Sequence, residues 1–239
     1  MRSRITSPLR RGFTLIELLT VIAIIGVLAA IVLSTVGKVR KIALKASATA
    51  DLRSVGLAIL AFAQDHRQTL PGPASLGIPP VYDRNTPDTD LPAAVGPYLG
   101  HRRRNTLSST DTETVQALIC PGFLQHQPEI AKQYPHYVQN YTLADVPGGR
   151  VFGRHASGSN EALPGMKLSE LERFGGAARV WALTNLDQQV SRDHPQMGSN
   201  SVTTSGWFSS LPETPVWGNS RLRVYFDGHV ASVPRNAAP

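Results

Sequence analysis

Cysteine is nearly absent from this chain of 239 residues, which contains only Cys120. A single thiol excludes an intramolecular disulfide framework and any zinc site built from several thiolates. Charged residues make up 17% of the chain and hydrophobic residues 41%, so the composition also excludes a wholly disordered protein. We therefore expect one folded domain with an appended segment, in which Cys120 is a small buried side chain.

Sequence patterns of common enzyme sites are absent as well. The chain contains no HExxH, GxSxG, P-loop or GxGxxG pattern, and none of its seven histidines lies four residues from another. Asp187, Asp193 and Asp227 could supply oxygen ligands to calcium, but their spacing fits no EF-hand-like loop. His194 is expected in a solvated loop. The sequence therefore predicts a protein that is not an enzyme and that has no cofactor and no metal site.

Positive charge is concentrated near the N-terminus, although the formal net charge of the whole chain is +7. Two clusters there exceed this excess by themselves: Arg2, Arg4, Arg10, Arg11, Lys38, Arg40, Lys41 and Lys45. Because the remainder is nearly neutral, a chain-wide nucleic-acid surface is not supported and nucleic acid is not an expected partner. The other basic run, His101–Arg104, predicts either a solvated loop or a contact with nucleic acid or an anionic glycan.

The most informative segment is the apolar run Phe13–Leu33, which has 21 residues and one charge, on Glu17. As a helix the run measures about 31 Å, which matches the hydrocarbon core of a bilayer. The small-residue cleavage pattern of a secretory signal is weak after Leu33, so the run predicts a membrane anchor. An ionisable group in a span is unfavourable, and Glu17 therefore either marks a partner or lies near the membrane interface.

Residues 10–19, RRGFTLIELL, resemble the cleavage and methylation signal of type IV prepilins and type II secretion pseudopilins. The resemblance implies that a prepilin peptidase cuts between Gly12 and Phe13 and that the new amino group of Phe13 is N-methylated. It also implies that Glu17 pairs with this amine on a neighbouring subunit, while the apolar helices form the core of a filament. Basic residues on both sides of the span give no orientation, whereas the resemblance places the leader in the cytoplasm. The chain departs from the family at Ser34, where a proline is common.

Beyond the span, apolar residues recur at spacings of three or four as far as Phe62. This pattern predicts an amphipathic helix that continues the span and ends before Pro71, with its lysines either solvated or against anionic lipid headgroups. The fold class that follows is α+β and pilin-like, with a long N-terminal helix packed on a C-terminal antiparallel sheet with long loops. The expected parts are a cleaved basic leader (1–12), a transmembrane half-helix (13–33), an amphipathic half-helix (34–70) and a loop-rich globular domain (71–239).

Short elements and long loops alternate in the globular domain. Seven prolines in residues 71–112 predict a loop with one short helix at 93–99. Residues 168–174 predict a helical turn that ends at two glycines, and residues 178–186 predict a buried strand.

The C-terminus predicts a β-hairpin. Residues 221–226 and 229–233 alternate between apolar and polar side chains, and Asp227-Gly228 between them suits a two-residue type I′ turn. This element resembles the C-terminal element of pilin-like proteins in which a histidine precedes Asp-Gly by nine residues. Trp217 stands where that histidine would fall, so a function ascribed to the histidine is not carried over.

Two functions are compatible with these patterns. The first is a structural subunit of a type II secretion or type IV pilus-like filament, in a single-pass arrangement in the inner membrane. Its partners would be the prepilin peptidase, other pilin-like subunits, the inner-membrane assembly machinery and the lipid bilayer. The second is a membrane-anchored or filament-tip module that binds exported protein, glycan or DNA. Exposed, adjacent Trp207, Phe208 and Trp217 side chains would favour the second function, and burial under the hairpin would favour the first.

Overall fold

The computed structural model describes residues 13–125, 134–143, 145–146, 149–156, 161–193 and 210–237. Gly12, Trp207, Phe208 and His194, all discussed above, lie outside the described residues. The chain divides into two compact units, residues 1–43 and residues 44–239. Helix α1 (Leu15–Asp65) contributes its N-terminal part to the first unit and its C-terminal part to the second.

The second unit is built on an antiparallel sheet. Within the described residues, five strands form this sheet in the order β1-β4-β5-β6-β7, and β2 and β3 form a separate pair. The strands are β1 (Gly77–Ile78), β2 (Val81–Asp83), β3 (Thr112–Thr114), β4 (Tyr137–Gln139), β5 (Trp181–Asn185), β6 (Ser220–Tyr225) and β7 (Val230–Pro234). The short helices are α2 (Leu91–Val95), η1 (Gly96–Leu99), η2 (Arg104–Thr106), η3 (Gln116–Leu118), α3 (Pro121–Leu124), η5 (Leu168–Phe174) and α4 (Gln188–Asp193).

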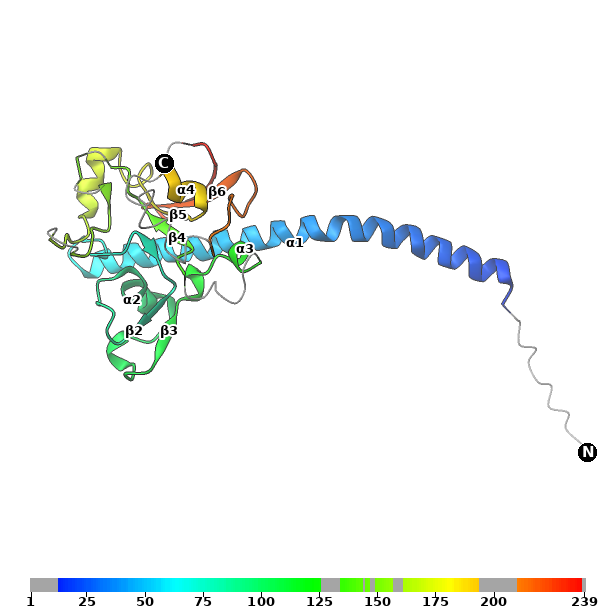
Figure 1. The fold of residues 1–239 in the computed structure, drawn as a ribbon, viewed down its shortest axis with the longest axis horizontal. Coiled ribbons are helices and arrows are strands. Elements are labelled where there is room, and N and C mark those ends of the chain that lie inside the picture. The colour runs from blue at the N-terminus through cyan, green and yellow to red at the C-terminus, as the bar shows by residue number, and fades with distance from the viewer. Residues whose placement is uncertain are drawn as a thin grey trace, which may run out of the picture. The chain divides into compact units, whose positions relative to one another are not determined.

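Residues 44–65 of α1 pack against this sheet through one helical face. The buried positions recur every three or four residues, as expected of an amphipathic helix: Ala48, Leu52, Val55, Gly56, Ala58, Ile59, Phe62 and Ala63. Figure 1 shows this part of α1 beside β4, β5 and β6, with α2, β2 and β3 on the helix's other side. The predicted α+β architecture, a long N-terminal helix on a C-terminal antiparallel sheet, is therefore confirmed. The helix ends at Asp65, before Pro71 as the pattern predicts.

Gly56 lies where α1 approaches β6. A Cβ atom built on this glycine would lie 2.7 Å from Cγ2 of Val224 and 3.7 Å from Cα of Gly228. Glycine thus permits a contact between helix and strand that a larger residue would obstruct. A glycine inside a helix by itself weakens the helix, so the contact with β6 gives this position a reason that helix propensity does not.

Lys45 connects α1 to both strands of the C-terminal hairpin. Its Nζ donates hydrogen bonds to Oγ of Ser220 at 3.0 Å and to Oγ of Ser232 at 2.8 Å. The sequence places this lysine on a solvated face or against lipid headgroups. In the structure its side chain instead holds β6 and β7 against the helix.

The C-terminal hairpin is present, with Asp227 and Gly228 in its turn. The prediction of a two-residue type I′ turn is wrong. Val224 pairs with Val230, the N–H of Tyr225 donates to His229 O, and the N–H of Gly228 donates to Tyr225 O. The loop therefore contains three residues, and Gly228 alone of them has a positive φ, of 85°. Phe226 causes the difference, because its side chain is buried in the core and draws one more residue into the turn.

The remaining predicted elements are close to their expected positions. A short helix spans α2 and η1, η5 ends at Gly175 with a positive φ of 99°, and every residue of β5 is buried. Burial of all five residues of β5 fits a strand in the middle of the sheet, with α1 on one of its faces.

Candidate functional site

Helix α1 begins with reciprocal hydrogen bonds between Thr14 and Glu17. The backbone N–H of Thr14 donates to Oε2 of Glu17 at 2.9 Å, and Oγ1 of Thr14 donates to the same oxygen at 2.7 Å. In return, the backbone N–H of Glu17 donates to Oγ1 of Thr14 at 3.3 Å. This arrangement is a capping box, in which Thr14 is the N-cap and Glu17 is the third helical residue.

The capping box gives Glu17 a role within its own chain. The first N–H groups of a helix have no intrahelical partner, and the helix dipole makes this end positive. A carboxylate at the third position therefore satisfies donors that would be costly to leave unpaired in lipid. Both bonds from Thr14 use Oε2, and Oε1 makes no hydrogen bond among the residues that the structure describes. The second carboxylate oxygen thus remains available to another partner.

The helix surface that follows this cap is apolar and exposed on all sides. Phe13 is 77% exposed, and every residue from there to Ala43 is exposed. The most apolar 18 residues have a mean hydropathy of 2.8 and none of them is buried in the chain. Among the described residues, α1 is the helix long and apolar enough to cross a membrane. Complete exposure distinguishes it from the core helix of a globular domain.

The carboxylate of Asp187, which could serve as a calcium ligand by its type, pairs with Arg221 instead. Its two carboxylate oxygens accept hydrogen bonds from Nε and Nη2 of Arg221 at 2.6 and 2.9 Å, and both side chains are buried. Oδ1 also accepts from the backbone N–H groups of Gln189 and Val190, at the start of α4. A bidentate ion pair of this kind is a structural link between β6 and α4. The side chain of Asp193 lies outside the described residues, and within them no cluster suited to a metal ion occurs.

Cys120 is buried, as the sequence predicts. Its backbone N–H donates to Nδ1 of His136 at 2.8 Å, and Nδ2 of Asn185 lies 3.5 Å from its sulfur. Burial raises the pKa of the thiol to about 11. The sulfur is therefore neutral at physiological pH, which suits a packing role and not that of a nucleophile.

Trp217 belongs to the hydrophobic core, with an exposed fraction of 7%. A Cβ atom built on Gly122 would lie 2.9 Å from its ring, so the indole packs directly on α3. Because it is buried, this aromatic side chain has a structural role and does not belong to an exposed binding surface.

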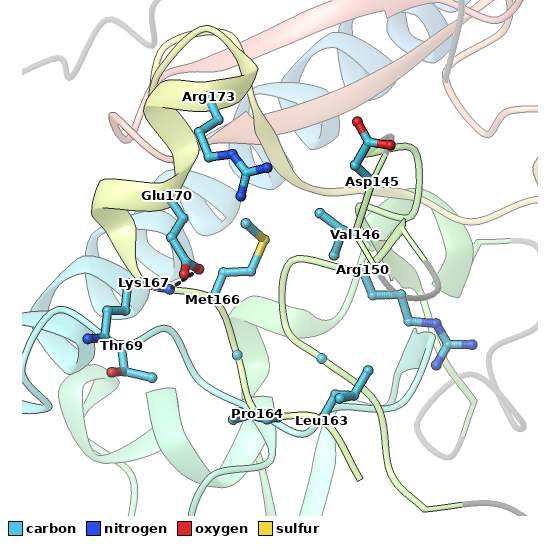
Figure 2. Close-up of a pocket in the computed structure, with 12 residues that line it drawn as sticks. Thr69, Asp145, Val146, Arg150, Leu163, Pro164, Met166, Lys167, Glu170 and Arg173 are labelled. Carbon is cyan, nitrogen blue, oxygen red and sulfur yellow. Dashed lines mark hydrogen bonds between the residues drawn. The ribbon is translucent and has the colours of Figure 1, made fainter. Parts of the chain in front are cut away.

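A cavity of about 450 Å³ lies between η5 and the segments around residues 145–153 and 163–167. Figure 2 shows the guanidinium of Arg173 pointing into it beside Met166, with the carboxylate of Asp145 across the space and Arg150 pointing away. Glu170, on the same helix as Arg173, accepts a hydrogen bond from the backbone N–H of Lys167 at 3.1 Å. Charges of both signs line the cavity, so its electrostatics select neither anions nor cations.

The capping box could have been found in the sequence, because Thr14-x-x-Glu17 before an apolar run is its usual signature. The sequence interpretation instead treats Glu17 as an isolated charge in an apolar segment. Cleavage between Gly12 and Phe13 and methylation of Phe13 remain predictions, since Gly12 lies outside the described residues.

Comparison with known proteins identifies the N-terminal segment. Residues 8–33 match the family described as the prokaryotic N-terminal methylation motif. No curated protein and no solved structure matches the chain. The resemblance of the C-terminal hairpin to the element of other pilin-like proteins, in which Trp217 replaces the histidine, finds no support in the comparison. A motif that spans Gly12, Phe13 and Glu17, followed by an exposed apolar helix, supports a type IV pilin-like or pseudopilin subunit. The N-terminus of this chain is thus a type IV prepilin-like methylation signal.

Proposed function

We propose that this chain is a structural subunit of a type II secretion or type IV pilus-like filament, assembled through its N-terminal helix. The observation that carries the proposal is the apolar surface of residues 13–33, which nothing in the chain covers among the described residues. In water such a surface is unfavourable, so it must be covered by lipid or by helices of neighbouring subunits. Lipid covers this surface while the subunit is in the membrane, and neighbouring helices cover it once the subunit is in a filament.

Processing would precede assembly. In this proposal a prepilin peptidase cuts between Gly12 and Phe13 at the cytoplasmic face of the inner membrane, and Phe13 becomes the N-methylated first residue. The chain then spans the inner membrane once, with its globular domain outside the cytoplasm. Inner-membrane assembly machinery and other pilin-like subunits complete the set of partners. The match to the methylation motif supports this order of events.

Glu17 would give subunit addition its direction. Oε2 is held by Thr14 of the same chain, and Oε1 has no partner among the described residues. The amine of Phe13 on a neighbouring subunit is a suitable donor to Oε1, because pairing offsets the cost of leaving either charge alone in lipid. The capping box fixes the carboxylate in place before the neighbour arrives, which reduces the side-chain entropy lost on pairing.

Substitution of Glu17 by Gln tests this role. Glutamine retains the size of the side chain and can still complete a capping box, so the variant removes mainly the charge. We expect Glu17→Gln to be inserted and cut like the wild type but to enter filaments at least roughly tenfold less, since the lost pairing is worth a few kcal/mol in lipid. The measurement is the amount of the chain in sheared filaments relative to the membrane fraction.

Thr20→Val is the matched control for this experiment. Thr20 lies one turn further along α1, and its hydroxyl donates only to the backbone carbonyl of Glu17, at 3.0 Å. This variant removes a polar group from the same segment without changing its charge, and we expect normal assembly. Normal assembly of Glu17→Gln as well would refute the pairing role and leave Glu17 with helix capping alone.

A further inference from the structure

The basic run His101–Arg104 is largely neutralised by nearby carboxylates. Nδ1 of His101 lies 3.1 Å from Oε1 of Glu113, and Arg102 contacts Glu113 at 2.9 Å and Asp111 at 3.2 Å. Arg104 forms a bidentate pair with Asp88. Three of the four side chains in the run therefore have an acidic partner and are not free to bind nucleic-acid phosphates.

Arg103 differs from its neighbours. Within the part of the chain that the structure describes, no carboxylate lies at ion-pair distance from its guanidinium. The side chain is exposed and lines a pocket of about 220 Å³. The pocket lies between the C-terminal end of α1 and the segment α2–η1–η2, and its wall includes Phe62, His66, Tyr98, Arg104 and Asn105. We call it the Arg103 pocket.

The walls of the Arg103 pocket are held in place by contacts behind them. The hydroxyl of Tyr98 donates to Oδ2 of Asp65 at 2.7 Å, and the ring of His66 stacks on Phe62 with centroids 3.8 Å apart. Arg104 donates to the carbonyl of Arg84 at 2.9 Å in addition to its pair with Asp88. The rings of Tyr98 and His66 and the guanidinium of Arg104 therefore lose little freedom when a ligand binds, whereas the exposed side chain of Arg103 has to be ordered by the ligand.

We propose that the Arg103 pocket binds one carboxylate-bearing sugar unit of an anionic glycan. The two guanidinium groups face a single lining carboxylate, that of Asp88, which is already paired with Arg104, so the pocket has an excess of positive charge. A guanidinium can bind a carboxylate through two parallel hydrogen bonds. The rings of Tyr98 and His66 line the pocket and can contact the C–H groups of a sugar, and the amide of Asn105 has both a donor and an acceptor for hydroxyl groups.

The volume and the charge of the Arg103 pocket together limit which ligands fit it. The pocket is smaller than the roughly 300–1,000 Å³ typical of sites for drug-sized molecules, so it suits one ring and not an extended chain. Nucleic-acid binding draws its affinity from several phosphate contacts, whereas this site offers one cation, Arg103, that makes no direct ion pair among the described residues. The hydrogen bond from Arg104 has the larger effect in lowering the pKa of Asp88, and the positive charge of Arg103 still contributes to it. A single acidic sugar satisfies both limits. The inference does not depend on the assembly role proposed for the N-terminal helix.

Calorimetric titration of the full chain in detergent tests this proposal with three probes. Glucuronate carries a carboxylate on a sugar ring, glucose has the ring without the charge, and inorganic phosphate has the charge without the ring. We expect glucuronate to bind at least roughly tenfold more tightly than either of the others, because only it uses the guanidinium and the aromatic walls together. No binding of glucuronate, or phosphate binding of equal strength, would overturn the proposal.

Two matched variants assign the binding to the pocket. Arg103→Gln removes the exposed guanidinium, and we expect it to weaken glucuronate binding by about tenfold or more. Arg102→Gln removes the adjacent guanidinium, which is held by Asp111 and Glu113 outside the pocket, and we expect a change of less than about twofold. Equal losses in the two variants would show attraction to the basic run as a whole and would contradict a site at Arg103.

Discussion

The two parts of helix α1 use the same kind of residue for different purposes. Leu28, in the first unit, is 57% exposed, whereas Leu52, in the second, is completely buried. Apolar side chains surround the helix axis in residues 13–33, whereas in residues 44–65 the buried side chains occupy one face. An all-round apolar helix suits lipid or a bundle of like helices, and a one-sided helix suits a sheet. One continuous helix therefore combines a fully exposed apolar segment with part of the core of a folded domain.

The charges in the two units show a related contrast. Glu17 is exposed, with one oxygen held by Thr14 and the other without a partner among the described residues. Asp187 and Arg221 are buried and satisfy each other through two hydrogen bonds. In the second unit the two charges of this pair therefore neutralise each other. In the first unit, one oxygen of Glu17 remains available to a partner from outside the chain.

The largest expected effect is the difference in stability between two variants, each of which shortens a leucine in one part of α1. Leu52→Ala should lower the free energy of unfolding of the globular domain by about 2–5 kcal/mol, because it leaves a cavity in the core. Leu28→Ala should leave that free energy unchanged within about 0.5 kcal/mol. Denaturant unfolding of the full chain in detergent, followed by tryptophan fluorescence, measures both. Similar losses in the two variants would contradict the distinction between the two halves.

A smaller effect is expected at the turn of the hairpin that packs beside α1. Gly228 has a φ of 85°, and a β-branched residue resists this conformation. Gly228→Val should cost about 1–2 kcal/mol and lower the melting temperature by several degrees. Asparagine tolerates positive φ, so Gly228→Asn should lose less than half as much. Equal melting temperatures for valine and asparagine variants would argue against a left-handed residue here.

The smallest expected effect is the slow alkylation of Cys120, which reports how well the core of the second unit excludes a reagent. With the pKa of Cys120 raised to about 11, only about one thiol in a thousand is ionised at pH 8. An alkylating reagent should therefore label the native chain very slowly at this pH and label it rapidly in denaturant. Since the pKa is raised, the thiol's contribution to stability is present below its ordinary value of 9.0 and declines as the pH rises toward 11. Fast native labelling would show an open core.

Features encoded locally could be predicted from the sequence. The apolar run, the one-sided periodicity up to Phe62, the buried strand and the hairpin all depend on neighbours within a few residues. The hairpin's turn type could not be predicted, because it depends on Phe226 and on the core into which that side chain is buried. The alternation of side chains fits either turn.

Contacts between distant parts of the sequence were beyond prediction. Lys45 meets Ser220 and Ser232 across 175 and 187 residues, and no local pattern indicates this. The acidic partners of His101–Arg104 likewise lie outside the run, at Asp88, Asp111 and Glu113. The run by itself therefore does not indicate that Arg103 makes no direct ion pair among the described residues, or that it lines a pocket with Arg104. At the N-terminus, the motif of residues 10–19 indicates the methylation signal, and Thr14-x-x-Glu17 is the local signature of the capping box.

The most direct test of the account is the intact mass of the chain isolated from the membrane of a cell that contains a prepilin peptidase. Cleavage after Gly12 leaves a mature chain of 239 − 12 = 227 residues that begins at Phe13. We expect this mass increased by that of one CH2 unit, because a methyl group replaces one hydrogen of the new amine, and fragmentation should place the methyl group on Phe13. A mature chain that begins beyond Leu33 would mean an ordinary secretory signal and would contradict a role in which residues 13–33 remain to build a filament.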